Sequence, residues 1–285
     1  MAKVGGEFER RAMNSPFSRE QSIMGILNIT EDSFSDGGCF LEVDDAIAQA
    51  RKIQEEGAKI LDIGAESTRP GARPIPTGVQ ITRLTPILQA LAQSKLEGID
   101  ISVDTGSAKV AAIAVKLGAR IINDISSGRG DPRMFPVVAD SNASIILTHM
   151  RGSPRDMQDT PRYKNVVVEV KEFLSRRVEV ALSSGIALER IAVDPGIGFG
   201  KTVEHNLELL DGLSEIVALG QPVVLGTSRK NFLSIICTQP QPSALIGATC
   251  ATTVLGAMAG VKIFRVHDVA ENYQALKFYL ACSAQ

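Results

Sequence analysis

Short apolar segments alternate with amphipathic helical segments along almost the whole chain, and this alternation restricts the fold more than any other feature. The first unit is typical: Ser22 to Ile29 reads as a buried strand, and 43–56 has apolar residues at helical spacing with Gly57 as a stop. Strands that alternate with helices form parallel βαβ units, because a parallel neighbour is reached only through a crossover connection.

Seven further units follow, with no change in composition that would indicate a second domain. The expected strands are 22–29, 59–65, 99–105, 120–125, 144–149, 191–195, 222–228 and 261–266. The expected helices are 43–56, 78–95, 108–117, 132–141, 164–184, 203–218, 243–259 and 269–281. Eight such units predict an α/β protein of the (β/α)8 TIM-barrel type, a single domain at 22–285 that follows an N-terminal tail at 1–21.

A doubly wound sheet is the competing fold. It usually has fewer strands and carries a Gly-x-Gly-x-x-Gly turn after a strand. No such turn follows a strand in this sequence, so the barrel is favoured.

The composition excludes several classes of function. Thirty basic residues balance 32 acidic ones among 285, so neither a nucleic acid nor a membrane is expected as a partner. No apolar run reaches the roughly 18 residues of a membrane-spanning helix. The four cysteines are scattered without a Cys-x-x-Cys pair, which predicts reduced thiols in a cytoplasmic protein, not a zinc site or a disulfide framework.

Every expected strand ends in polar or charged residues, although a buried strand would otherwise carry apolar ones. In a (β/α)8 barrel these ends meet at one rim, which is where active sites are built. Buried polar groups need hydrogen-bond partners, so a ring of them predicts a ligand with many donors and acceptors. The main residues at the strand ends are Asn28, Asp62, Glu66, Asp104, Asn123, Asp124, His149, Asp194, Ser228, Lys230, Arg265, His267 and Asp268. Taken singly, Asp62, Asp124 or Asp268 is explained equally well as a capping group or as a buried polar residue tied to a loop.

Two kinds of chemistry can be read from this set. Carboxylates, an amide and an ammonium suit a flat heterocycle with amino, ring N–H and carbonyl edges, and they are provided by Asp104, Asn123, Asp194 and Lys230. Cationic groups with an amide suit an anion such as a phosphate, and they are provided by Asn28, Arg69, Arg265 and His267.

Simpler interpretations apply to four other features. The glycine-rich segment 196–200 either lets backbone approach a ligand or is only a strand-to-helix turn. Lys201 is expected to be a solvated charge, and His205 is expected to be a surface residue or a capping residue of the helix that begins near 203. His149 has two open interpretations, a site residue or a side chain packed under the rim.

Taken in order, these motifs resemble those of the dihydropteroate synthase family of the folate pathway. The matching stretches are 24–30, 32–38, 66–71 (Glu-Ser-Thr-Arg-Pro-Gly), 101–105, 122–125, 149–150, 194–201 (Asp-Pro-Gly-Ile-Gly-Phe-Gly-Lys), 228–230 (Ser-Arg-Lys) and 265–268 (Arg-Val-His-Asp). The resemblance extends over about 22–280. It implies a (β/α)8 barrel that condenses 6-hydroxymethyl-7,8-dihydropterin diphosphate with p-aminobenzoate to give 7,8-dihydropteroate and diphosphate.

The resemblance also implies roles for individual residues. The pterin would be bound by Asp104, Asn123, Asp194, Lys230 and Arg265. The p-aminobenzoate would be bound by Thr68, Arg69, Pro70, Phe199 and Ser228, together with Lys230. The diphosphate would be bound by Asn28, Arg69, Arg265 and His267, with Asn28 also reaching Mg²⁺, the implied cofactor. The implied catalytic residues are Asp104 and Lys230, and Asp32 and Asp36 are candidates for binding Mg²⁺ or accepting a proton.

The implied mechanism is an SN1-like displacement. Diphosphate is a good leaving group once Mg²⁺ and nearby cations neutralise its charge, and its departure leaves a cationic methylene that the aniline nitrogen attacks. The resemblance also implies a homodimer. The Ala-rich segment 244–259, taken alone, fits packing against its own barrel equally well.

Some positions depart from the family pattern, notably Glu31 where Pro is usual, Ala65 where Gly is usual, and Thr148 and Thr227 where apolar residues are usual. None removes an assigned ligand, but they leave open whether sulfonamides, which imitate p-aminobenzoate, bind normally.

Two rival functions remain. One is a pterin-binding methyltransferase acting on methyltetrahydrofolate and a corrinoid protein, which would need no diphosphate site. The other is an inactive pterin-binding barrel, which should lack one of the charged ligands, yet none is missing.

Overall fold

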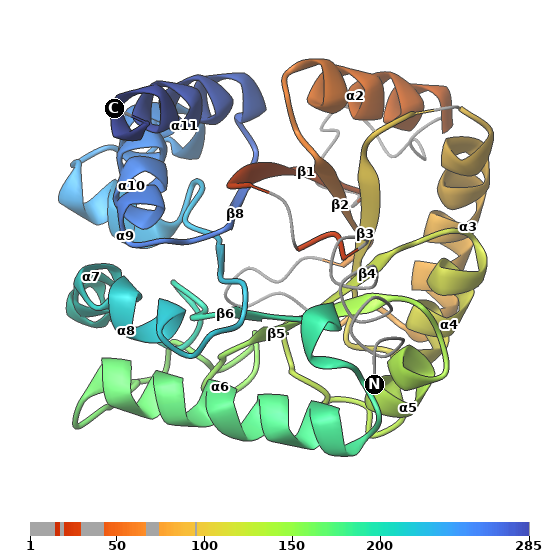
Figure 1. Cartoon of the computed structure of the whole chain (residues 1–285), viewed down its shortest axis with the longest axis horizontal. Helices are drawn as coiled ribbons and strands as arrows, with labels where there is room; N and C mark the ends of the chain where they lie inside the picture. Colours follow the sequence, from red (N-terminus) through yellow and green to blue (C-terminus); the bar gives the residue numbers. More distant parts are fainter. Residues whose placement is uncertain (1–14, 18–19, 30–42, 67–73, 95, 285) are drawn as a thin grey trace, which may run out of the picture.

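Eight parallel strands form one sheet in the order β6-β5-β4-β3-β2-β1-β8-β7, and helices surround it (Figure 1). This computed structural model describes residues 15–17, 20–29, 43–66, 74–94 and 96–284. The two ends of the strand order also meet, because Val193 forms a parallel bridge with Val223 and donates its N–H to Pro222 O at 2.9 Å. The sheet therefore closes, and the predicted (β/α)8 barrel is confirmed.

The strands are short and almost wholly buried, because helices cover the outer face and the barrel interior covers the other. They are β1 (Ser22–Asn28), β2 (Ile60–Gly64), β3 (Asp100–Asp104), β4 (Ile121–Asp124), β5 (Ser144–Thr148), β6 (Ile191–Asp194), β7 (Val224–Leu225) and β8 (Ile263–Val266). All eight fall within the predicted ranges. β7 is much shorter than predicted, because its chain leaves the sheet in a turn in which Lys230 N–H donates to Thr227 O.

The helices follow the strands as expected, with two differences. They are α2 (Val43–Glu55), α3 (Thr77–Gln93), α4 (Ala108–Lys116), α5 (Met134–Ala139), α6 (Val166–Ser183), α7 (Val203–Asp211), α8 (Leu213–Val217), α9 (Asn231–Ile236), α10 (Ile246–Met258) and α11 (Val269–Ser283). The predicted helix 203–218 is two helices that meet at Gly212, where a Cβ would lie 2.7 Å from Val167 of α6. The short helix α9 was not predicted.

The amino ends of the strands are closed by apolar side chains. Phe17 is buried there in a cluster with Met24, Ile60, Ile121, Ile146, Ala192, Val224 and Ile263. Ser15 Oγ, two residues earlier, donates to Glu189 O at 2.6 Å. This part of the predicted N-terminal tail therefore packs against the barrel, while residues 1–14 and 18–19 lie outside the described part of the chain.

Within the described residues, none of the helices is long and apolar enough to cross a membrane. Cys237, Cys250 and Cys282 are free thiols, as predicted, and Cys39 lies outside the described residues.

Candidate active site

The register of the strands places the predicted polar residues in one layer at their carboxyl ends. Asn28 pairs with Gly64, Gly64 with Asp104, and Asp104 with Asn123 across β1 to β4. Because Gly64 has no side chain, the space between Asn28 and Asp104 is left open: a Cβ there would lie 3.8 Å from Asn28 Oδ1 and 3.5 Å from Asp104 Cβ. The predicted rim of polar groups therefore exists.

Arg265 on β8 lies at the centre of this layer and joins two strands across the barrel. Its Nε donates to Asp62 Oδ2 at 2.6 Å, and one Nη donates to Asp104 Oδ2 at 2.9 Å. Asn123 Nδ2 also donates to Asp62 Oδ2 at 3.2 Å. Asp62 is fully buried and accepts a further hydrogen bond from Ser102 Oγ at 2.6 Å.

Asp62 is the main residue that sequence reasoning left outside the site. The sequence did indicate its importance, because a carboxylate inside the apolar strand Ile60–Gly64 must be paired. The interpretation of Asp62 as a cap was wrong, because its partner is Arg265. Asp62 neutralises and orients Arg265, so it positions a predicted pterin-binding residue.

Two buried carboxylates therefore share one guanidinium. Burial raises the pKa of Asp104 to about 7, helped by the neighbouring Asp62 carboxylate and opposed by Arg265. The pKa of Arg265 is raised, because the attraction of Asp62 and Asp104 outweighs the effect of its own burial. Asp104 thus stays close to a protonation change near neutral pH, which is a common property of active-site carboxyl groups.

Asp194 and Lys230 form the second part of the rim. Burial raises the pKa of Asp194, although its Oδ1 accepts the N–H of Gly196 at 2.7 Å. Burial and the Arg265 cation lower the pKa of Lys230 to about 8, against the attraction of Asp194 and Asp104. Lys230 Nζ lies 3.9 Å from the centroid of the Phe199 ring. Five predicted residues, Asp104, Asn123, Asp194, Lys230 and Arg265, therefore converge.

The loops after β7 and β8 are joined to each other. Ser228 Oγ lies 3.0 Å from His267 Nδ1 and accepts the N–H of His267 at 3.2 Å. Arg229, between Ser228 and Lys230, has a φ of 59° and pairs through two hydrogen bonds with Asp268. A positive φ is strained for an arginine, and this pairing holds it in place.

Some predicted residues cannot be placed. Asp32 and Asp36 in the first loop, and Thr68, Arg69 and Pro70 in the second, lie outside the described residues. The described part of the chain contains no group of three or more His, Cys, Asp or Glu residues that could hold a metal ion.

The simpler interpretations had mixed outcomes. His205 forms a capping box with Thr202, as predicted. The expectation that Lys201 is solvated is wrong, because Lys201 is only 3% exposed and hydrogen-bonds to His149. Thr227 is bonded to Thr252 of α10 at 2.6 Å, so its hydroxyl is satisfied by the fold and not by a ligand.

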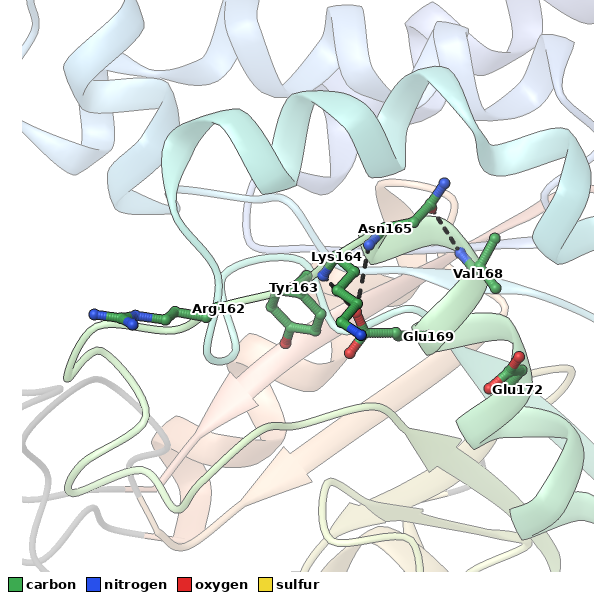
Figure 2. A pocket seen from close by; sticks show the side chains of 7 residues that line it. All are labelled: Arg162, Tyr163, Lys164, Asn165, Val168, Glu169 and Glu172. Atoms are coloured by element: carbon green, nitrogen blue, oxygen red, sulfur yellow. Dashed lines mark hydrogen bonds between the residues drawn. The ribbon is translucent and has the colours of Figure 1, made fainter.

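The hollows on the outside of the barrel are distinct from this rim. One, with a volume of about 520 Å³, is lined by residues 162–165 and by Val168, Glu169 and Glu172 at the start of α6 (Figure 2). Local contacts satisfy its polar groups: Asn165 caps the helix through the N–H of Val168, and Glu169 accepts the N–H of Lys164. We therefore assign the candidate site to the strand ends.

Comparison with known proteins agrees with this geometry. The model of the pterin-binding enzyme family matches residues 24–267. The dihydropteroate synthase of Synechocystis sp. is 44% identical over 258 residues, which are 90% of this chain and 88% of that protein. The chain belongs to the dihydropteroate synthase family of pterin-binding enzymes. The resemblance found in its motifs is thus confirmed.

Two further relatives bear on the dihydropteroate synthase assignment. The mitochondrial folate synthesis bifunctional protein of Pisum sativum is 44% identical over 92% of this chain, which spans only 53% of that protein, about half its length. A solved structure of the Xanthomonas albilineans dihydropteroate synthase with 4-aminobenzoic acid superimposes with a TM-score of 0.87 at 39% identity, covering 93% of this chain and 94% of that one.

Proposed function

We propose that this protein condenses 6-hydroxymethyl-7,8-dihydropterin diphosphate with p-aminobenzoate, giving 7,8-dihydropteroate and diphosphate for folate synthesis. The observation that carries the proposal is the convergence of Asp104, Asn123, Asp194 and Lys230 around the paired Arg265. Membership in the family and the 4-aminobenzoic acid bound to a relative of similar structure support the same reaction.

On this proposal the carboxyl and amide groups bind the edge of the pterin ring. Asp104 and Asp194 accept its N–H donors, and Asn123 both donates and accepts. Arg265 stacks on the ring face, which a planar guanidinium does well, while Asp62 and Asp104 fix its plane. Lys230 donates to a ring acceptor and contributes to the second pocket with Phe199 and Ser228.

The diphosphate would lie against Asn28, Arg265 and His267. The residues fit Mg²⁺ because this ion accepts few protein ligands and takes most of its coordination from phosphate and water oxygens, so the open Asn28 amide oxygen suffices on the protein side. When bound, Mg²⁺ would neutralise charge on the leaving diphosphate. Asp32 and Asp36 as further ligands or proton acceptors, and Thr68, Arg69 and Pro70 as p-aminobenzoate contacts, stay predictions.

The reaction then needs no side-chain nucleophile. Arg265 and His267 stabilise the negative charge that grows on the leaving diphosphate. Asp104 and Asp194, at the edge of the ring, stabilise the positive charge that develops on the pterin methylene. Lys230, Phe199 and Ser228 orient p-aminobenzoate so that its amine faces that carbon. Holding the two reacting groups in this geometry lowers the entropic part of the activation barrier.

We also propose a homodimer formed through the face of α9, α10 and α11, where α10 and α11 lie side by side (Figure 1). Large apolar side chains are exposed there, namely Ile235, Ile236, Leu255, Met258 and Phe278, the last two by 66% and 74%. Exposed apolar patches of this kind mark protein interfaces. A charged substitution, Met258→Glu, should give a monomer in light scattering, and an unchanged dimer would exclude this face.

The cytoplasmic location expected from the cysteines stays a prediction.

The alternative function is methyl transfer from methyltetrahydrofolate to a corrinoid protein. It would use the pterin-binding residues but has no anion to bind at Asn28 and His267. Two incubations of the purified protein separate the functions: one contains the pterin diphosphate, p-aminobenzoate and Mg²⁺, and the other contains methyltetrahydrofolate and a corrinoid protein. We expect 7,8-dihydropteroate in the first and no transfer in the second, and the reverse result would replace the proposal with the alternative.

Inhibition by a sulfonamide, measured against the KM for p-aminobenzoate, tests the second substrate. Competitive inhibition would support p-aminobenzoate as the ligand of the pocket at Phe199 and Ser228. Weak inhibition with a normal KM would identify a sulfonamide-insensitive form of the same enzyme.

A further inference from the structure

The loop between β6 and α7 contains a buried lysine that the proposed mechanism does not use. The first part of the loop, Gly196 to Gly200, comes directly before this residue, Lys201, and its three glycines have φ values of 68°, 79° and 64°. A Cβ on Gly196 would lie 1.9 Å from His149 O, and one on Gly200 would lie 2.5 Å from Arg151 O. Such a loop has little side-chain packing of its own at these positions, so its conformation has to be held by contacts from outside.

Lys201 provides the first of these contacts. Its Nζ lies 2.8 Å from Gly196 O, 3.0 Å from Phe199 O and 2.9 Å from His149 Nδ1. Burial lowers the pKa of Lys201 well below its usual value. As an ammonium the group donates to all three partners, and as a neutral amine it donates to the two carbonyls and accepts from the N–H of His149 Nδ1, so each form is fully hydrogen-bonded. Burial and the adjacent Lys201 lower the pKa of His149 to about 2, so the imidazole is neutral and its Nδ1 can accept. The amine is thus saturated by the fold, with no donor left for a substrate.

The segment between β5 and α6 provides the other contacts. Gln158 Nε2 donates to Gly198 O at 2.8 Å, and Tyr163 Oη donates to Gly200 O at 2.8 Å. Figure 2 shows Tyr163 just before the start of α6. The carbonyl oxygens of residues 196, 198, 199 and 200 therefore all accept hydrogen bonds from side chains, two of them from Lys201.

This loop has two large side chains: Ile197 is buried in the main core, and Phe199 is the one whose ring lies against Lys230. The ring is 7% exposed and packs in a cluster with Met150 and Met157. Its face carries the Lys230 ammonium at 3.9 Å. A cation held over an aromatic face is sensitive to the position of the ring, so a shift of Phe199 moves Lys230 relative to the site.

We propose that Lys201 is a positioning residue that acts through Phe199: by holding the carbonyls of Gly196 and Phe199, it sets the wall of the p-aminobenzoate pocket. This inference rests on the proposed function. Gln158 and Tyr163 assist by holding the neighbouring carbonyls. Lys201 itself touches no substrate, so its effect should fall on the second substrate more than on the pterin diphosphate.

The first test is Lys201→Met, which keeps the length of the side chain and removes its donors. We expect the KM for p-aminobenzoate to rise about tenfold, with the KM for the pterin diphosphate within about twofold. Lys52→Met is the matched control, because Lys52 is on α2 with a side chain 65% exposed, and it should change neither constant. An equal rise in both KM values, or no change in either, would overturn the proposal.

The second test is a double-mutant cycle with Phe199→Leu. If Lys201 acts through Phe199, Lys201→Met should add less than about twofold to the p-aminobenzoate KM of a protein that already carries Phe199→Leu. A full additional tenfold rise would mean that the two residues act independently and would refute the mechanism. A wild-type protein that makes no dihydropteroate would instead refute the proposed function, so the two failures are distinguishable.

Tyr163→Phe provides a milder variant in case Lys201→Met does not fold. It removes only the hydroxyl that donates to Gly200 O. We expect the p-aminobenzoate KM to rise about threefold and the KM for the pterin diphosphate to stay constant, in keeping with the loss of a single hydrogen bond. A p-aminobenzoate KM equal to that of the wild type would contradict the role given to these contacts.

Discussion

The two ends of the barrel are built from the same eight strands but are filled in opposite ways. At the amino ends Phe17 and seven other apolar residues form a cluster, and the one buried carboxylate described there, Asp100 at the start of β3, is paired with Arg120 at 2.6 Å. At the carboxyl ends Asp62, Asp104 and Arg265 are buried together, with Asp194 and Lys230 nearby. Burying apolar area stabilises a fold directly, whereas burying charges costs free energy unless they are paired.

The difference teaches where stability and function are located in this chain. The amino end should contribute stability and tolerate any change that keeps its volume. The carboxyl end should contribute little stability, but almost any substitution there should lower activity. Substitutions at the two ends should therefore have effects of opposite kinds.

The largest expected effect on stability is at the amino end. Phe17→Ala should lower the free energy of unfolding by about 3–5 kcal/mol, because it removes a buried ring and leaves a cavity. Both KM values should be unchanged, since Phe17 packs in the apolar cluster at the amino ends of the strands, and the rim is at their carboxyl ends. Denaturant melts and steady-state kinetics check both points, with Phe17→Leu as the conservative control. A changed KM in a variant that still folds would break the division between the ends.

The matching change at the carboxyl end is Lys230→Met. Turnover should fall by about 10² to 10³, because Lys230 both binds the pterin ring and orients p-aminobenzoate, while the melting temperature stays the same or rises because a cation disfavoured by burial is gone. Lys109→Met, an exposed position on α4, should alter neither quantity. Near-normal turnover of Lys230→Met would remove Lys230 from the site.

A smaller effect should come from the link between the last two loops. Asp268→Asn weakens the pairing that holds Arg229 at its positive φ, between Ser228 and Lys230. We expect kcat/KM for p-aminobenzoate to fall about fivefold to tenfold, with a coupling energy to Arg229→Met of about 1 kcal/mol, since the pair is partly exposed. A cycle in which the two substitutions are additive would show that this pairing does not shape the site.

The smallest effect concerns pH. Because the pKa of Asp104 is raised by burial from 3.8 to about 7, its carboxyl group stabilises the fold below pH 3.8, and this contribution is lost as the pH rises to about 7. Relative to Asp104→Asn, the wild type should lose at most about 1.4 kcal/mol of stability for each pH unit in that window. Unfolding at pH 5.5 and 6.5 measures this, and the same stability difference at both pH values would mean that Arg265 keeps Asp104 ionised in the folded protein.

The fold was predictable because its signal is repeated. Each strand is a short apolar run followed by a helical period, so an error in one unit does not change the topology. The local errors came from tertiary contacts: Gly212 divides a helix because α6 is too close, and the Arg229 turn shortens β7. The burial of Phe17 was not predicted, because a single apolar residue in a charged segment forms no periodic apolar pattern that would indicate a buried face.

The candidate site was predictable as a list of residues but not as a network. Asp104, Asn123, Asp194, Lys230 and Arg265 end their strands, and strand ends are visible in a sequence. That Asp62 pairs with Arg265 depends on strands separated by 203 positions, which no local pattern reveals. Lys201 looked solvated because lysines usually are, and only the folded loop brings three acceptors to its amine.

The central role proposed for the rim is to join two substrates with loss of diphosphate. The decisive measurement is the stoichiometry of diphosphate and 7,8-dihydropteroate released by the purified protein with the pterin diphosphate, p-aminobenzoate and Mg²⁺. We predict that the two products appear in equal amounts and that neither forms when one substrate is omitted. Release of diphosphate without consumption of p-aminobenzoate would contradict the account.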